Sequence, residues 1–472
     1  YIIDMDTENN IDILDTLFDF FAYSSVDVIR KRIAETLLPT KEQIRQNAEI
    51  PTREDCVDEM LDKMPVSFWK RDKKVFEPCC GKGNFVLGIF EKFFTHLTDI
   101  VNKKERCRII IEDCIYFSDI EQINIIHTKR LLVLLCAKLV LGEDAWTYTS
   151  YEEVSQIYNF NFNERIGNTL DLTFEFNFDA IIGNPPYQER NKNGKSKHGK
   201  SNLWTKFIDY SMDLLKKNGY LLFITPTSWM GGTVTCWPKM ISNQIHYLNV
   251  NECKKYFPGV GSTFSYYLIE KCDIYKDTDV VCLYKKKVYE SSLRFNKNLL
   301  MIPQLLNQNS LTIINKLFQW DNEKIFIRKD LIKNDNPTQK VKTDEYNNPV
   351  LTFVRPNGYK DIQYSNFKLM NQDNKKVLLF RSGYINPTYE NGSAGVGNNI
   401  HYATVETEEE GLNLESMYKS DLYKFIFSIC ATSQYNNGRV MNWLYRKNPQ
   451  YEDIYDYFQL NKDEKDLILS TI

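Results

Sequence analysis

A short apolar segment that runs directly into two prolines constrains the fold of this chain more than any other feature. Residues 178–182 are apolar apart from one aspartate, and the tetrapeptide Asn184-Pro185-Pro186-Tyr187 follows almost at once. A run of this length and composition predicts a buried strand. The prolines fix the backbone beyond the strand and remove two amide donors, so their carbonyls can point into a pocket unopposed. We therefore expect a buried strand whose carboxyl end presents polar groups.

Short apolar runs alternate with amphipathic segments over residues 51–292, which predicts an α/β domain wound around a mostly parallel sheet. Residues 1–50 have helical spacing and are expected to form an N-terminal extension. Residues 293–472 mix short aromatic-rich strands with a helical close, which predicts a separate α+β domain. Strands are expected at residues 74–76, 115–119, 178–182, 220–224 and 264–269, and helices near residues 84–100, 120–141 and 202–217.

Composition excludes several classes of protein. With 472 residues, 43% of them hydrophobic, the chain should fold as two or three domains rather than stay disordered. Its eleven cysteines form no Cys-x-x-Cys pair, which argues against a zinc ribbon or a disulfide framework and for a reducing, intracellular and cytoplasmic location. No apolar run approaches the roughly 18 residues of a membrane span. The net charge of −3 means that any contact with nucleic acid needs a local basic face.

Residues 75–85 contain an apolar strand, a turn with Gly81 and Gly83, and the start of a helix. Glycines let the backbone approach a ligand closely, and free amides at a helix start suit a polar or charged group. Glycines alone would equally fit an ordinary strand-to-helix turn. The acid Glu77 before a cysteine pair and the closing Phe85 make the pattern more specific. It resembles the glycine motif of class I methyltransferases that act on nucleic acid, where the glycines surround the methionine part of S-adenosylmethionine.

Two further segments are candidates for the same ligand. Asp119 ends a predicted strand, and a carboxylate there can accept hydrogen bonds from both ribose hydroxyls. Glu121 competes for this role, and a helix N-cap is the plainer alternative for Asp119. Asn168, in a short turn, could accept a hydrogen bond from the adenine amine of the cofactor, or could simply form a surface turn.

The tetrapeptide that begins at Asn184 suits a planar amine as substrate. An aromatic amine is a poor nucleophile because its lone pair is conjugated with the ring. If the Asn184 side-chain oxygen and the Pro185 carbonyl each accept one of its hydrogens, the nitrogen moves toward tetrahedral geometry and its lone pair can attack the sulfonium methyl. This chemistry needs no metal and no strong base. We expect Tyr187 to stack on the flat face of the base.

Two later segments could contact the substrate. Residues 188–200 are basic, polar and glycine-containing, which predicts a loop that contacts phosphates; a solvated loop without a partner is the alternative. An extruded base needs aromatic walls, and Phe257 could supply the wall opposite Tyr187 or could belong to the core. The candidate phosphate-contacting side chains are Lys192, Lys195, Lys197 and Lys200.

With these residues assembled, the chain resembles the γ class of N6-adenine DNA methyltransferases found in restriction–modification systems. A segment containing Thr52, the glycine turn, the tetrapeptide, the Phe257-Pro258 segment and a C-terminal domain follow one another in the order of that class. The resemblance implies a Rossmann-like domain at residues 51–292, base flipping, and target recognition on double-stranded DNA by residues 293–472. It also implies that a separate restriction endonuclease could accompany the chain. The cofactor-binding residues that it implies are Thr52, Glu77, Pro78, Cys79, Gly81, Gly83, Phe85, Asp119, Ile120 and Asn168.

Other activities fit the same tetrapeptide. An RNA adenine methyltransferase needs no change to the pocket, and a protein-glutamine methyltransferase uses the tetrapeptide on a planar amide but lacks a large C-terminal domain. A non-catalytic nucleic-acid-binding subunit would be expected to have lost Asn184 or the glycine turn, and both are present. The prediction is therefore a site-specific, adenine-specific DNA methyltransferase that uses S-adenosylmethionine.

Overall fold

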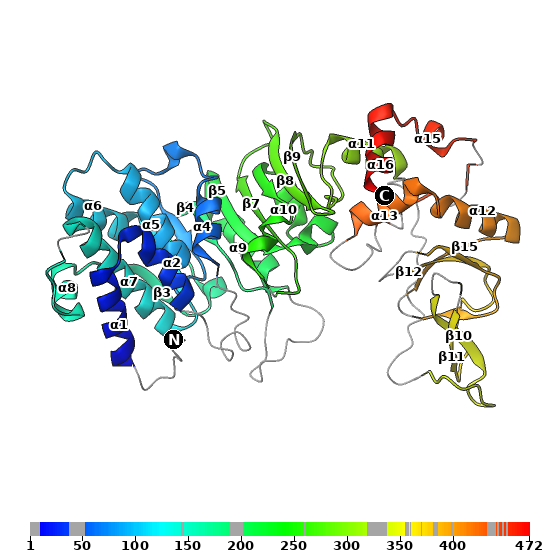
Figure 1. Cartoon of the computed structure of the whole chain (residues 1–472), viewed down its shortest axis with the longest axis horizontal. Helices are drawn as coiled ribbons and strands as arrows, with labels where there is room; N and C mark the ends of the chain where they lie inside the picture. The colour runs from blue at the N-terminus through cyan, green and yellow to red at the C-terminus, as the bar shows by residue number, and fades with distance from the viewer. Residues whose placement is uncertain are drawn as a thin grey trace. The chain divides into compact units, whose positions relative to one another are not determined.

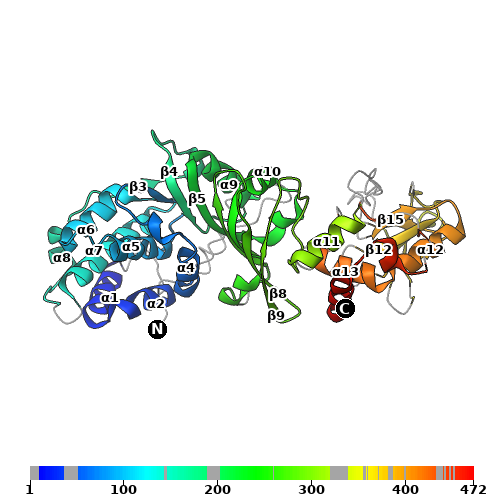
Figure 2. The same ribbon diagram turned by 90° about the horizontal axis from the view of Figure 1, so that it is seen from above.

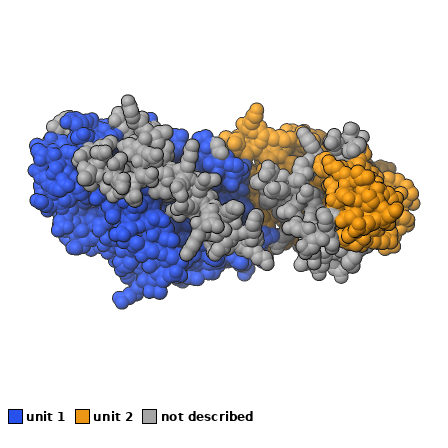
Figure 3. Space-filling view, turned by 90° about the horizontal axis from the view of Figure 1, so that it is seen from below, with its two compact units in different colours: residues 1–229, 233–281, 292–299 blue, residues 230–232, 282–291, 300–472 orange. Residues whose placement is uncertain are grey.

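The computed structural model divides into two compact units (Figure 3). The first comprises Tyr1–Trp229, Thr233–Val281 and Ser292–Leu299, and the second Met230–Gly232, Cys282–Ser291 and Leu300–Ile472. The structure describes residues 10–36, 52–142, 146–188, 202–258, 260–318, 338–354, 358, 360–369, 371–380, 386–397, 400–431, 440, 443–445, 448–449 and 452–472.

A nine-stranded sheet organises the first unit, in the order β3-β2-β1-β4-β5-β7-β6-β8-β9 (Figure 1). The pairs from β3 to β5 are parallel, and β7 pairs antiparallel with both β5 and β6. Residues 282–291, which include the end of β8 and most of β9, belong to the second unit. The strands are β1 (Val75–Glu77), β2 (Ile115–Asp119), β3 (Asn163–Ile166), β4 (Phe178–Gly183), β5 (Leu215–Pro226), β6 (Gln244–Asn249), β7 (Phe264–Glu270), β8 (Thr278–Tyr284) and β9 (Lys287–Leu293).

The central strands are buried on both faces, as expected where helices cover a parallel sheet. Every residue of β1 and β4 is buried, and in the register Val75 lies between Ile115 of β2 and Ala180 of β4. Both strands therefore end at the same edge of the sheet. The predicted α/β fold with a mostly parallel sheet is confirmed.

Helices of the first unit pack beside this sheet and against one another. The N-terminal pair, α1 and α2, lies beside α5 and α7 (Figures 1 and 2). The helices are α1 (Asn10–Tyr23), α2 (Val26–Thr36), α4 (Glu54–Leu61), α5 (Asn84–His96), α6 (Lys103–Ile109), α7 (Gln122–Leu141), α8 (Tyr151–Ile157), α9 (Leu203–Leu214) and α10 (Trp237–Ile241). Short helical turns are η1 (Val66–Phe68), η2 (Ile110–Cys114), η3 (Thr169–Asp171), η4 (Thr227–Gly231) and η5 (Glu252–Tyr256).

Two predicted helices end earlier than the apolar pattern suggested. Helix α9 stops at Leu214 because Leu215 already pairs with Phe178 of β4. Helix α5 stops at His96, where the N–H of Leu97 closes the last turn on the carbonyl of Phe93. Apolar spacing does not distinguish a last helical turn from the first residues of a buried strand.

The second unit contains two three-stranded sheets with a shared apolar core. The sheets have the orders β11-β10-β14 and β13-β12-β15. Leu351, Leu378, Phe380 and Ile400 belong to one buried cluster drawn from both sheets. The elements are β10 (Asn348–Val354), β11 (Lys360–Ser365), β12 (Lys376–Phe380), β13 (Thr388–Glu390), β14 (Gly395–Val396), β15 (Ile400–Thr404), α11 (Gln308–Leu317), α12 (Glu408–Tyr418), α13 (Asp421–Cys430), α15 (Ile454–Tyr457) and α16 (Lys462–Thr471).

None of the helices that the structure describes is both long and apolar enough to cross a membrane.

Candidate active site

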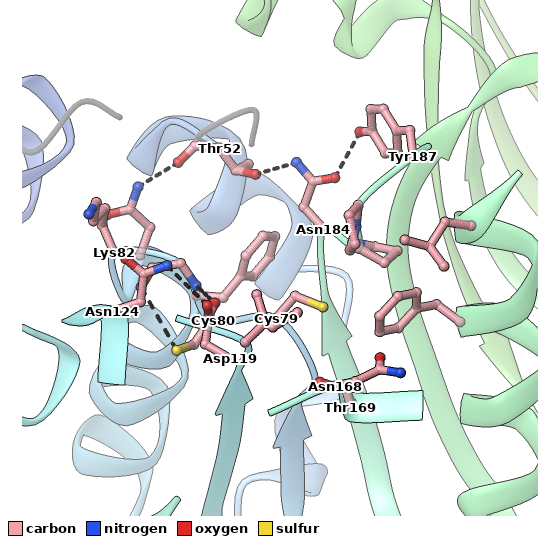
Figure 4. A pocket seen from close by; sticks show the side chains of 18 of the residues that line it. Thr52, Cys79, Cys80, Lys82, Asp119, Asn124, Asn168, Thr169, Asn184 and Tyr187 are labelled. Atoms are coloured by element: carbon pink, nitrogen blue, oxygen red, sulfur yellow. Dashed lines mark hydrogen bonds between the residues drawn. The ribbon is translucent and has the colours of Figure 1, made fainter. Parts of the chain in front are cut away.

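A pocket opens in the first unit where β1, β2 and β4 end (Figure 4). Open α/β sheets bind their ligands at this edge, outside the carboxyl ends of the strands. Most of the predicted site residues lie together here although they come from distant parts of the chain. The lining residues are Thr52, Cys79, Cys80, Gly81, Lys82, Asn84, Phe85, Asp119, Ile120, Asn124, Gly167, Asn168, Thr169, Asn184, Pro185, Pro186, Tyr187, Leu203 and Phe207.

The turn after β1 has the backbone that its glycines allow. Gly81 and Gly83 have φ values of 51° and 90°, in the left-handed region that side chains disfavour. A Cβ atom at Gly83 would also lie 2.9 Å from the Thr128 hydroxyl. Gly83 is the N-cap of α5, so the tight turn brings the start of that helix to the pocket.

Asp119, at the end of β2, holds this turn in place through a hydrogen bond. Its Oδ2 atom accepts a hydrogen bond from the N–H of Gly81 at 2.8 Å, and its Oδ1 atom accepts from the N–H of Glu121 and the amide of Asn124. Burial raises the pKa of Asp119 above its ordinary value, although these three donors act in the opposite direction. The carboxylate thus lines the pocket and also holds the glycine turn against β2, whereas Glu121 is not among the lining residues.

Glu77 and Pro78 lie behind the lining and not in it. The Glu77 side chain is buried; its Oε1 atom accepts from the N–H of Cys79 at 3.2 Å. Burial raises the pKa of Glu77 well above its ordinary value, the Cys79 N–H opposes this, and the Asp119 carboxylate adds to it. The carbonyl of Pro78 accepts from the Ser118 and Thr169 hydroxyls, at 2.9 and 2.6 Å. These contacts fix the turn, and two of the partners, Cys79 and Thr169, line the pocket.

Asn168 lines the pocket, but its side chain also caps a short helical turn. Its amide donates to Asp171 at 2.7 Å, and its oxygen accepts from the N–H of Leu170 at 3.4 Å. The second predicted alternative, a surface turn, therefore describes the local hydrogen bonds of Asn168. Its role toward a cofactor stays a prediction.

Asn184 occupies the centre of a short hydrogen-bonded chain (Figure 4). Its side-chain Nδ2 donates to the Thr52 hydroxyl at 3.0 Å, and its Oδ1 accepts from the Tyr187 hydroxyl at 2.7 Å. The Tyr187 side chain is buried, and its ring lies 5.5 Å from that of Phe264, centre to centre. The structure thus brings Asn184 together with Thr52, which is distant in the sequence, and with Tyr187, which lies on the other side of two prolines.

Among the described residues, Gly83 and Phe257 are also not in the pocket lining. Phe257 is buried and packs on Phe264, with ring centres 4.7 Å apart, so it occupies the core position that was the alternative to a base-stacking role. Lys192, Lys195, Lys197 and Lys200 lie outside the described residues.

Sequence reasoning missed several lining residues, among them Lys82, Asn124 and Phe207. Lys82 was visible between the two glycines of the turn, where a buried lysine is uncommon. Asn124 and Phe207 lie on helices whose apolar pattern gives no sign of which residue faces a ligand.

Comparison with known proteins shows what part of this domain resembles. Residues 113–256 match the family model described as Eco57I restriction-modification methylase. A protein of Mycoplasma pneumoniae named "Uncharacterized adenine-specific methylase" is 43% identical over 53 residues, a stretch that covers 11% of this chain and only 12% of that relative.

Two solved structures share the fold over most of the chain. The Type IIL restriction-modification enzyme MmeI, solved in complex with DNA, matches with a TM-score of 0.50 at 12% identity, over 86% of this chain and 69% of its own. The DrdV–DNA complex matches with a TM-score of 0.50 at 10% identity, over 94% of this chain and 60% of that one. The family match and the Mycoplasma relative confirm the predicted resemblance to the adenine methylases of restriction–modification systems, and the two solved structures show the shared fold.

Proposed function

We propose that this chain transfers a methyl group from S-adenosylmethionine to the 6-amino group of an adenine in DNA. The observation that carries the proposal is the convergence of Asn184 and Pro185 with the glycine turn on one pocket. A group that can activate a planar amine thus lies beside a turn that suits a nucleoside ligand.

The lining residues fit S-adenosylmethionine in their chemistry. Ile120, with 63% of its surface exposed, offers an apolar face for a flat heteroaromatic ring. The Asp119 carboxylate, the buried Lys82 and the turn around Gly81 supply charged and polar groups for the ribose and methionine parts. When bound, this cofactor supplies a methyl group activated by a positively charged sulfur. We assign cofactor binding to Thr52, Cys79, Gly81, Phe85, Asp119, Ile120 and Asn168, with Glu77, Pro78 and Gly83 shaping the turn.

The substrate side of the pocket belongs to the tetrapeptide. The Asn184 Oδ1 atom already accepts one hydrogen bond from Tyr187, and a carbonyl oxygen has two lone pairs, so it can accept a second from the target amine. Pro185, in a stretch with two prolines and thus without competing amide donors, offers its carbonyl to the other N–H. Two acceptors that hold the amine in this way draw electron density onto its nitrogen and orient it. Tyr187 supplies the aromatic surface for the base, and residues 293–472 supply target recognition on duplex DNA.

A labelling experiment tests the proposal and its alternatives together. The protein is incubated with methyl-labelled S-adenosylmethionine and a mixture of unmethylated bacterial chromosomal DNA, cellular RNA and protein, and the three pools are then separated. We expect label in DNA alone, in a nucleoside that co-elutes with N6-methyladenosine in its deoxy form. Label confined to RNA or to glutamine in protein would refute the DNA assignment and identify one of the two alternatives.

A further inference from the structure

Methyl transfer as proposed requires one of the two orientations of the Asn184 side-chain amide. The oxygen and nitrogen ends of a side-chain amide are almost the same size, so packing does not choose between two orientations related by a half-turn. Only one orientation presents an acceptor to the target amine. The other presents a donor, which would repel the hydrogens of the amine.

The Tyr187 hydroxyl selects the productive orientation, and the Thr52 hydroxyl bonds the amide nitrogen in that orientation. A phenol donates well but accepts poorly, because its lone pair is conjugated with the ring, and the buried hydroxyl of Tyr187 needs an acceptor. It donates to the Asn184 Oδ1 at 2.7 Å, and the Thr52 hydroxyl accepts from the Nδ2 at 3.0 Å. A half-turn of the amide would leave the Tyr187 proton without this acceptor.

The segment that carries Thr52 is itself held in place. Its backbone carbonyl accepts from the Asn84 side chain, in the first turn of α5, at 2.9 Å. Helix α4 begins two residues later, and its Glu59 accepts hydrogen bonds from the Tyr256 and Tyr266 hydroxyls. The Thr52 hydroxyl therefore has a fixed position beside the Asn184 amide, and Thr52 is buried with 5% of its residue surface exposed.

We propose that Thr52 is a positioning residue for methyl transfer, whose hydroxyl holds the Asn184 amide with its oxygen toward the target amine. This role is separate from the cofactor contact assigned to Thr52 above, and it rests on the proposed function. It also connects the helix that follows the glycine turn, through Asn84 and Thr52, to the group that activates the substrate.

The test compares Thr52→Val, which keeps the shape but removes the acceptor, with Thr52→Ser, which keeps the hydroxyl. The rate of a single round of transfer is measured on whichever pool accepts label from the wild-type protein, and the dissociation constant of S-adenosylmethionine is measured by calorimetry. At a cofactor concentration that saturates each variant, we expect Thr52→Val to slow transfer about tenfold, as for loss of one hydrogen bond, while any loss of the cofactor contact appears separately in the dissociation constant. Thr52→Ser should restore most of the rate.

Thr278→Val is the matched control, because Thr278 is also a buried threonine of the first unit and its hydroxyl donates to the Ile245 carbonyl away from the pocket. It should lower stability without changing the rate. A wild-type rate in Thr52→Val at saturating cofactor, with or without a loss of cofactor affinity, would overturn the positioning role alone. Absence of label in every pool from the wild-type protein would overturn the proposed function, and the positioning role with it.

Discussion

Hydrogen-bonded polar side chains have different surroundings in the two units. In the first unit, Asn184 and Asp119 receive hydrogen bonds from neighbours but also line an open pocket. In the second, Lys376 and Glu390 form an ion pair of 2.7 Å in which neither side chain is exposed. The polar groups of the first unit can therefore still contact a ligand, whereas the ion pair of the second unit is enclosed by protein.

The enclosed pair uses its hydrogen-bonding capacity within the second unit. The Lys376 ammonium donates to the carbonyls of Asn371 and Asn374, both at 2.8 Å. The Glu390 carboxylate accepts from the N–H groups of Gly392 and Ser393 and thereby folds the glycine-rich stretch that leads into β14. A network satisfied in this way specifies a fold, whereas acceptors that face a pocket are available for chemistry.

Substitution of Lys376 should have the largest effect on stability and tests whether the enclosed pair organises the second unit. Lys376→Met leaves the Glu390 carboxylate buried without its cation, which should lower the free energy of unfolding of the second unit by about 3–5 kcal/mol. Urea denaturation measures this loss, and hydrogen exchange at residues 392–396 should show the same opening. The adjacent Lys375 is exposed, so Lys375→Met is the matched control and should change stability by less than about 0.5 kcal/mol. Equal effects of the two substitutions would show that the pair does not organise this unit.

At the pocket, the expected loss is in rate and not in stability. Asn184→Ala removes an acceptor for the target amine and should slow transfer by about 10²–10³-fold, a cost typical of a deleted transition-state hydrogen bond. Cofactor affinity and the urea midpoint should stay near wild type. Asn177 precedes the same strand at its opposite end and is exposed, so Asn177→Ala should keep the full rate. Retained turnover in Asn184→Ala would mean that the amine is activated elsewhere.

Glu77 shares a property with each set of polar groups. Its side chain is enclosed, as that of Lys376 is, but it lies directly behind the pocket. Burial raises its pKa well above the ordinary value of 4.5. An acid whose pKa is raised by folding stabilises the folded state below its ordinary pKa, and this contribution is lost as pH rises toward the raised value. The wild-type protein should therefore lose up to about 1.4 kcal/mol for each pH unit above 4.5 through this group.

Glu77→Gln cannot ionise and should not show this loss. The urea midpoint of Glu77→Gln should equal that of wild type at about pH 5 and exceed it at about pH 8. The mutant-minus-wild-type difference isolates Glu77 from other carboxylates. A difference that does not grow with pH would show that Glu77 is already ionised in the folded protein.

Much of the first unit and its pocket could be predicted because the signals are local. A buried strand, two prolines and a glycine turn each leave a mark within ten residues, and motif order was enough to include Thr52. The hydrogen bond between Thr52 and Asn184 could not be predicted, since 132 residues separate them and no pattern specifies side-chain direction.

The second unit was less predictable for the same physical reason. Strand β10 pairs with β14 and β12 with β15, so both sheets depend on contacts between strands that are not adjacent in sequence. Lys376 begins a strand in a polar stretch, where a lysine is normally exposed, and nothing nearby indicates that its partner is Glu390. Phe257 illustrates the same limit in the first unit, because an aromatic residue before a strand fits a base-stacking wall and a core equally well.

The smallest expected change in stability is at an exposed ion pair of the second unit, and it is a reference for the large loss expected in Lys376→Met. Lys424 and Asp421 form an ion pair of 2.8 Å, close to the length of the Lys376–Glu390 pair, but their side chains are 55% and 49% exposed. Solvent screens such a pair, so Lys424→Met should change the free energy of unfolding by no more than about 0.5 kcal/mol. Measured beside Lys376→Met in urea, it uses the same substitution at a pair of similar length, so the two results compare an exposed charge with one enclosed together with its backbone partners. A cost of several kcal/mol at Lys424 would mean that lysine-to-methionine replacement, rather than enclosure of the charge, explains the result at Lys376.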